Sequence, residues 1–140
     1  MMKSKPILLV LVVVVAALSA MLMKSVTEKR AGKERHAADE SVLREFSTAL
    51  KPGTPRSQVE ALLDSRGRSF QQMCCLLDEN RNALQDLVRI GSEPKAWYCS
   101  TSDMYLVFEF DSLPDPRSPK ANPNDTLRKI ALSPWQQGCL

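Results

Sequence analysis

The first 23 residues contain one uninterrupted apolar stretch. Residues 7–23 form a run of seventeen positions with Ser19 as the only polar one, after a short start that carries Lys3 and Lys5. A helix over this run is about 26 Å long, slightly less than the thickness of a hydrocarbon core. Because no polar face interrupts the run, we predict a membrane-spanning signal anchor over residues 1–23 rather than a buried core helix. The alternative is a signal peptide that is cleaved near Ser19.

Polar residues replace the apolar ones from residue 24 to residue 38. This segment is interpreted as a solvated tether or as a polar extension of the anchor helix. Residues 24–36 carry five basic and two acidic side chains, and the positive-inside rule alone would leave the following domain in the cytoplasm. A leading signal-like segment and four cysteines favour the opposite orientation, with the domain outside the cytoplasm.

The residues after the tether have the periodicity of a helix. A stripe of apolar side chains predicts a helix over residues 39–50; its members are Val42, Leu43, Phe46 and Leu50. Lys51-Pro52-Gly53 then breaks the chain. A second helix is expected over residues 55–65, with Thr54 as its N-cap and Pro55 in its first position. Gly67 is expected to close this helix in a left-handed conformation.

The last third of the chain has the alternation of strands. Residues 104–110 and 126–132 are the predicted antiparallel strands, and residues 96–99 are expected to pair with the first of them. Pro134 is expected to end the last strand. Four prolines in residues 112–125 predict a surface loop. Residues 69–90 fit a helix and an extended strand equally well.

These elements predict an α+β fold. An N-terminal membrane-spanning helix is followed by two helices packed on a small antiparallel sheet of three or four strands. The expected domains are a signal anchor over 1–23, a polar tether over 24–38, and one small α+β domain over 39–140, which contains the proline-rich loop.

Composition excludes several classes of function. The net charge of +3 comes from the N-terminus, because residues 25–140 carry 16 basic and 16 acidic side chains. A neutral body argues against nucleic-acid binding. A single histidine, His36, lies in the tether, so neither a histidine-based metal site nor a base for a catalytic thiol is visible. Glu109, Asp111 and Asp115 are expected to form a solvated face rather than a catalytic pair. We therefore expect no cofactor, no metal and no catalysis.

The four cysteines predict at least one disulfide that includes Cys99. Adjacent cysteines rarely bond to each other, so Cys74 and Cys75 would pair with Cys99 and Cys139 in either order. A third option is a single Cys99–Cys139 bridge that ties the C-terminal tail to the first strand of the hairpin and leaves Cys74 and Cys75 as free core thiols.

The order of elements resembles a known family. The resemblance rests on two groups of residues. The first is Gly53-Thr54 followed by Val59, Leu62 and Leu63. The second is Trp97-Tyr98, Phe108-x-Phe110-Asp111 and Leu127-x-Lys129-Ile130. They resemble the small domain of the BamE (SmpA/OmlA) outer-membrane assembly lipoproteins and the repeat of the β-lactamase inhibitory protein. The chain departs from the pattern because it has no lipid-accepting cysteine. The resemblance implies a bacterial envelope domain that binds other proteins without catalysis.

We therefore expect a single-pass membrane protein with an extracytoplasmic domain that binds another protein. Candidate contact residues are aromatic side chains and polar side chains of the proline-rich loop: Trp97, Tyr98, Asp115, Arg117 and Lys120. Trp97 is interpreted first as a core residue and second as an interface anchor. The alternatives are a domain secreted after cleavage and a small exported hydrolase that uses serine and carboxylate side chains.

Overall fold

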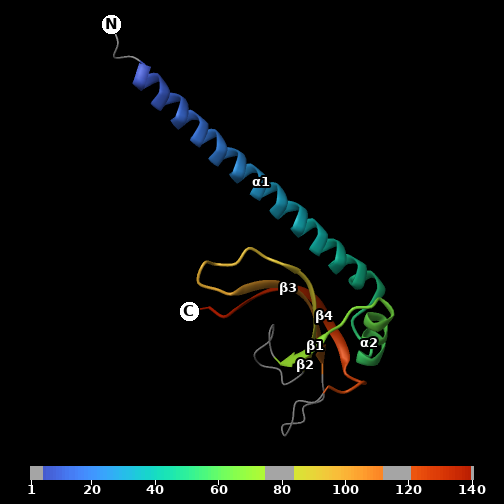
Figure 1. The fold of residues 1–140 in the computed structure, drawn as a ribbon. Helices are drawn as coiled ribbons and strands as arrows, with labels where there is room; N and C mark the ends of the chain where they lie inside the picture. Colours follow the sequence, from blue (N-terminus) through green and yellow to red (C-terminus); the bar gives the residue numbers. More distant parts are fainter. Residues whose placement is uncertain (1–4, 75–83, 112–120, 140) are drawn as a thin grey trace. The chain divides into compact units, whose positions relative to one another are not determined.

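The computed structural model describes residues 5–74, 84–111 and 121–139. The chain forms two compact units, Met1–Ala37 and Ala38–Leu140, and each is described here by itself. The elements are two helices followed by four strands, which confirms the predicted α+β class (Figure 1).

Helix α1 runs from Lys5 to Ala49 without a break. Its apolar side chains between Leu9 and Met23 are exposed. The helix is long and apolar enough to cross a membrane, a test that a signal sequence also passes. The segment predicted as a tether is a polar extension of the same helix. Lysine, glutamate, arginine and alanine dominate this segment, and these residues have high helix propensity.

The end of α1 and helix α2, Arg56–Ser65, bring the predicted apolar stripes into the core. Phe46 of α1, Leu50 directly after it, and Val59 and Leu63 of α2 are buried. The turn between the two helices uses a left-handed glycine, Gly53, with a φ of 90°.

The prediction that Thr54 caps α2 is wrong. The residue at the N-cap is Pro55, and no side chain caps the helix. The hydroxyl of Thr54 instead donates to the carbonyl of Lys51 at 2.7 Å and so closes the turn. The amide of Arg56 donates to the carbonyl of Asp125 at 2.7 Å, and the next amide donates to that of Pro123 at 3.1 Å. Backbone carbonyls from the segment before the last strand therefore replace the side-chain cap.

The four strands form an antiparallel sheet in sequence order. Strand β1 is Gln71–Cys74, β2 is Leu84–Ser92, β3 is Thr101–Asp111 and β4 is Thr126–Gln137. The predicted strands 104–110 and 126–132 are confirmed and extended. The ambiguous residues 69–90 contain β1 and most of β2.

Two details of the strand prediction are wrong. Residues 96–99 are not a strand, because β2 pairs with β3 in their place. Pro134 does not end β4 but lies opposite Met104 within it. Strand β4 is at the edge of the sheet, where the missing N–H of proline is tolerated.

The sheet buries side chains on both of its faces. The face covered by the helices holds the main cluster: Phe46, Leu50, Val59, Leu63, Val88, Leu106, Phe108, Phe110 and Leu127. The other face holds Leu87, Tyr105 and Val107, with Met73 and Trp135 packed against them. Glu109, which was expected to face water, has only 1% of its surface exposed. Lys129 lies 3.1 Å from its carboxylate and compensates the buried charge.

We expect Phe108→Ala to lower the free energy of unfolding by about 3–5 kcal/mol, since it removes a fully buried ring. The ring lies edge-on to that of Phe46 at 5.7 Å. Urea denaturation in detergent measures the loss. Phe108→Leu keeps most of the volume and serves as the control. Equal stability of Phe108→Ala and the parent would show that this part of the core is not packed as described.

Candidate functional site

The connection between β2 and β3 presents two aromatic side chains. We call residues 93–100 the aromatic turn. Trp97 is 91% exposed and Tyr98 is 44% exposed, and their rings meet edge-to-face at 5.7 Å. The prediction that Trp97 lies in the core is therefore wrong. Cys99, two residues later, points inward and is buried.

A disulfide holds the aromatic turn to the end of β4. Cys99 and Cys139 are bonded, with their Cα atoms 4.0 Å apart, which confirms the predicted bridge that includes Cys99 and its pairing with Cys139. The free thiols expected at Cys74 and Cys75 stay a prediction. Pairing of Cys99 with Cys74 or Cys75 is thereby excluded. Cys74 is the last residue of β1, and Cys75 lies outside the described residues.

Hydrogen bonds fix the same turn. The amide of Cys99 donates to the carbonyl of Ala96, and the amide of Ser100 donates to that of Gln137, both at 3.0 Å. Gly138 has a φ of 61°, and a Cβ there would collide with the hydroxyl of Ser100. A glycine is therefore required for the tail to pass so close to the turn.

We expect Cys99→Ser with Cys139→Ser to lower the free energy of unfolding by about 3–4 kcal/mol, because the bridge spans 40 residues of chain. Urea denaturation of the oxidised parent and of the double variant measures the difference. The double variant under reducing conditions is the control, because it separates loss of the Cys99–Cys139 bridge from any effect of reduction on Cys74 and Cys75. Parent protein isolated from its native compartment with a free Cys99 thiol would contradict the bridge.

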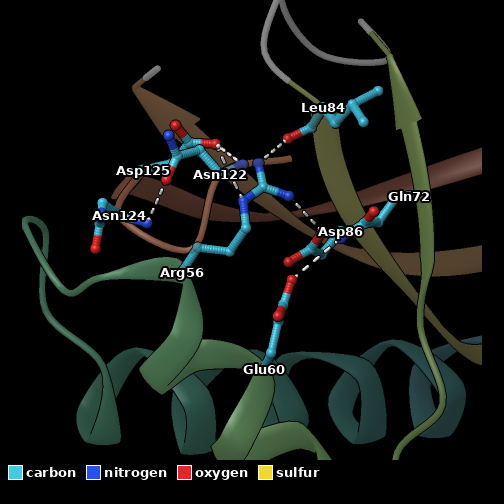
Figure 2. Close-up of polar contacts among 8 residues, drawn as sticks. All are labelled: Arg56, Glu60, Gln72, Leu84, Asp86, Asn122, Asn124 and Asp125. Atoms are coloured by element: carbon cyan, nitrogen blue, oxygen red, sulfur yellow. Dashed lines mark hydrogen bonds and ion pairs between the residues drawn. The ribbon is translucent and has the colours of Figure 1, made fainter. Parts of the chain in front are cut away.

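A second group of polar side chains is buried around Arg56. Its guanidinium, 1% exposed, lies between strand β2 and the segment before β4 (Figure 2). Nη1 donates to Oδ1 of Asp86 at 2.8 Å, and Nη2 donates to the carbonyl of Leu84. Nε lies 3.3 Å from Oδ2 of Asp125. The guanidinium also lies over the ring of Phe110, 3.9 Å from its centre. One side chain of α2 thus contacts β2, β3 and the approach to β4.

The segment that carries Asp125 is itself ordered by hydrogen bonds. Oδ2 of Asp125 accepts from the amide of Asn122 at 3.0 Å, and the side chain of Asn122 accepts from the amide of Asn124 at 2.9 Å (Figure 2). Asp125 therefore supplies a carboxylate to Arg56 and a carbonyl to the start of α2 from one fixed position.

Burial raises the pKa of Asp86 to about 7. Loss of hydration is the main cause, and the nearby charge of Glu60 adds to it, while Arg56 and a hydrogen bond from Gln72 oppose it. Glu60 lies at the edge of the cluster and accepts from the side-chain amide of Gln72 at 3.1 Å. Asp86 is thus the titrating member of the cluster near neutral pH.

Neither Arg56 nor Asp86 was predicted as a site residue from the sequence. Two signals were available. A cation in the first turn of a helix is unfavourable to the helix dipole, so Arg56 after Pro55 needs an external partner. Asp86 interrupts a strand beside Leu87 and Val88, where a charge needs an opposite charge. Neither signal identifies which residue pairs with Arg56 or with Asp86, because the two residues are 30 positions apart in the sequence.

The remaining predicted site residues are Thr54 and three polar residues of the proline-rich loop. Asp115, Arg117 and Lys120 lie outside the described residues, and Thr54 lies in the turn between the helices. An open hollow of about 410 Å³ is lined by Ser69, Arg89, Ile90, Gly91 and Ser92. Arg89 in this hollow is paired with Asp103 at 2.8 Å.

We expect the unfolding free energy to fall by about 2–4 kcal/mol through Asp86 as pH rises from about 4 to about 7. The pKa of Asp86 is higher in the folded than in the unfolded chain, so the folded state holds the proton more tightly. Urea denaturation over this pH range tests it, and Asp86→Asn should remove this part of the slope.

Glu60→Gln is the matched control for the pH series. It removes a neighbouring negative charge, lowers the pKa of Asp86 and shifts the end of the slope to lower pH. An unchanged pH dependence in Asp86→Asn would show that another group is responsible.

Comparison with protein-family models, with curated proteins and with solved structures finds no match for this chain. The resemblance to the BamE family therefore stays a prediction.

Proposed function

We propose that this protein is a non-catalytic domain, tethered to a membrane by α1, that binds another protein along the outer edge of β4. The observation that carries the proposal is the length and composition of that edge. Strand β4 has twelve residues, about twice the usual length of a strand. Among the described residues, no strand pairs with its outer side.

Within the described ranges, contacts cover this edge only near its ends. The first residues are covered by the turn between the helices, where Gly53 donates to the carbonyl of Leu127 and the amide of Leu127 donates to Thr54. Pro134 blocks further pairing near the other end. Between them, Ile130 and Leu132 are partly buried against the main core. An extended segment of a partner that adds to residues 128–133 would use backbone hydrogen bonds and cover these side chains.

The membrane part of the proposal is supported by the exposed surface of α1. Large apolar side chains between Leu9 and Met23 are 50–71% exposed, and a continuous apolar surface of this kind is covered by lipid or by another protein. We infer that the anchor stays attached and that the domain lies outside the cytoplasm. The Cys99–Cys139 bridge supports this orientation, since disulfides persist in oxidising compartments.

The polar groups favour binding over catalysis. Arg56, Asp86 and Asp125 are committed to one another, and Arg89 in the open hollow is committed to Asp103. A catalytic base or nucleophile needs a polar neighbour and a free approach to substrate. The alternative proposal of a hydrolase has no such arrangement among the described residues.

We expect a photo-crosslinking residue at Ser133 of β4 to give a discrete protein adduct in membranes from the native source. The adduct should disappear when excess unlabelled chain competes for the partner. Gln58 of α2 is exposed on the helical hairpin and provides the control position. Flotation of the same membranes tests the anchor independently.

Equal adducts from Gln58 and β4, or no saturable adduct from β4, would contradict the binding edge. Recovery of a soluble native chain that starts near Ala20 would contradict the anchor and support cleavage.

A further inference from the structure

The aromatic turn places apolar surface in solvent at a position where nothing in the fold requires it. Trp97 makes its ring contact with Tyr98 and leaves 91% of its own surface exposed. The main core and the second cluster are complete without either ring. Such exposure at a loop tip indicates a binding surface.

The turn is held in one conformation before any contact is made. The disulfide to Cys139, the bond from Ser100 to Gln137 and the bond from Cys99 to Ala96 act within four residues of the two rings. Little backbone entropy is therefore lost when the rings are buried.

The size of the surface favours lipid over protein. Two aromatic side chains bury about 150–250 Å² each, whereas a stable protein interface buries about 800 Å² on each partner. Tryptophan and tyrosine are enriched at the boundary between lipid headgroups and hydrocarbon, where the ring is apolar and the N–H or O–H stays hydrated. Two aromatic rings are enough to make contact with that layer.

The charge near the rings indicates which part of a lipid is contacted. Glu93 and Lys95 are the charged residues of the turn, so its net charge is zero, and the ammonium of Lys95 donates to the carbonyl of Ser100 at 2.8 Å. Attraction to anionic headgroups needs several unpaired cations. The contact is therefore with the interfacial layer common to all lipids.

The chain also keeps this surface near a bilayer. Fourteen residues from Lys24 to Ala37 separate the apolar run from the domain, which is about 21 Å of helix. A domain of about a hundred residues is about 30 Å across. A spacer shorter than the domain keeps its surface at a high effective concentration relative to the membrane.

We propose that the aromatic turn inserts Trp97 and Tyr98 into the interfacial layer of the membrane that α1 spans. This inference rests on the anchoring part of the proposed function and not on the binding of a partner to β4. Insertion gives the domain a second attachment to the bilayer.

The test uses the full chain in phosphatidylcholine vesicles. Trp135→Phe leaves Trp97 as the single tryptophan, because the chain has two. Lipids brominated near the headgroup end of the acyl chain should quench Trp97 more strongly than lipids brominated near the methyl end, and aqueous iodide should quench it weakly. High salt and added phosphatidylglycerol should change neither result.

The matched control is Trp97→Phe, which leaves Trp135 packed against Tyr105. Its emission should be unaffected by brominated lipid. Retention of the Cys99–Cys139 bridge in both variants, measured by thiol counting, shows that the turn is intact.

Vesicles that carry the chain by flotation while Trp97 stays open to iodide would overturn the insertion and leave the anchor in place. Failure to float would contradict the anchor, and the insertion with it. Protection from iodide only after a partner protein is added would assign the turn to a protein interface instead.

Discussion

The buried guanidinium of Arg56 is the contact on which the arrangement of the domain depends. It joins α2 to Asp86 on β2, to Phe110 on β3 and to Asp125 in the segment before β4. Removal of one partner from a buried ion pair commonly destabilises a protein by about 3–5 kcal/mol, because the remaining charge has no solvent. The apolar contacts of α2 fix its distance from the sheet, and Arg56 fixes its direction and its position along the strands.

Hydrophobic periodicity predicted the parts of the fold that depend on local pattern. The stripe through Phe46 and Leu50 and the alternation through Leu106 and Phe108 define helices and strands from neighbouring residues alone. The same pattern could not distinguish the exposed Trp97 from a core residue, because ring burial depends on which strand pairs with β3. The cap of α2 was predicted wrongly for a similar reason. Thr54 has the right chemistry at the right position, but carbonyls about 70 residues away occupy the amides first.

The two candidate surfaces differ in what keeps them available. In the part of the chain that the structure describes, the turn after α1 covers only the start of the outer edge of β4, and Pro134 interrupts pairing near its far end. The aromatic turn stays exposed because the bridge to Cys139 prevents the rings from folding back onto the sheet. Secondary structure creates the edge of β4, and a covalent bond maintains the aromatic turn. Neither proposed contact requires the domain to change its conformation.

The position of Asp125 in the chain has a consequence for folding. Its carbonyl completes the first turn of α2, and its carboxylate neutralises a cation in that turn, although 69 residues separate it from Arg56. Helix α2 is made early during synthesis, yet its charged start has no partner until most of the chain is available. Contacts of such long sequence separation slow folding, since a large loop must close first. The helical hairpin and the last strand are therefore expected to become stable in a single late step rather than one after the other.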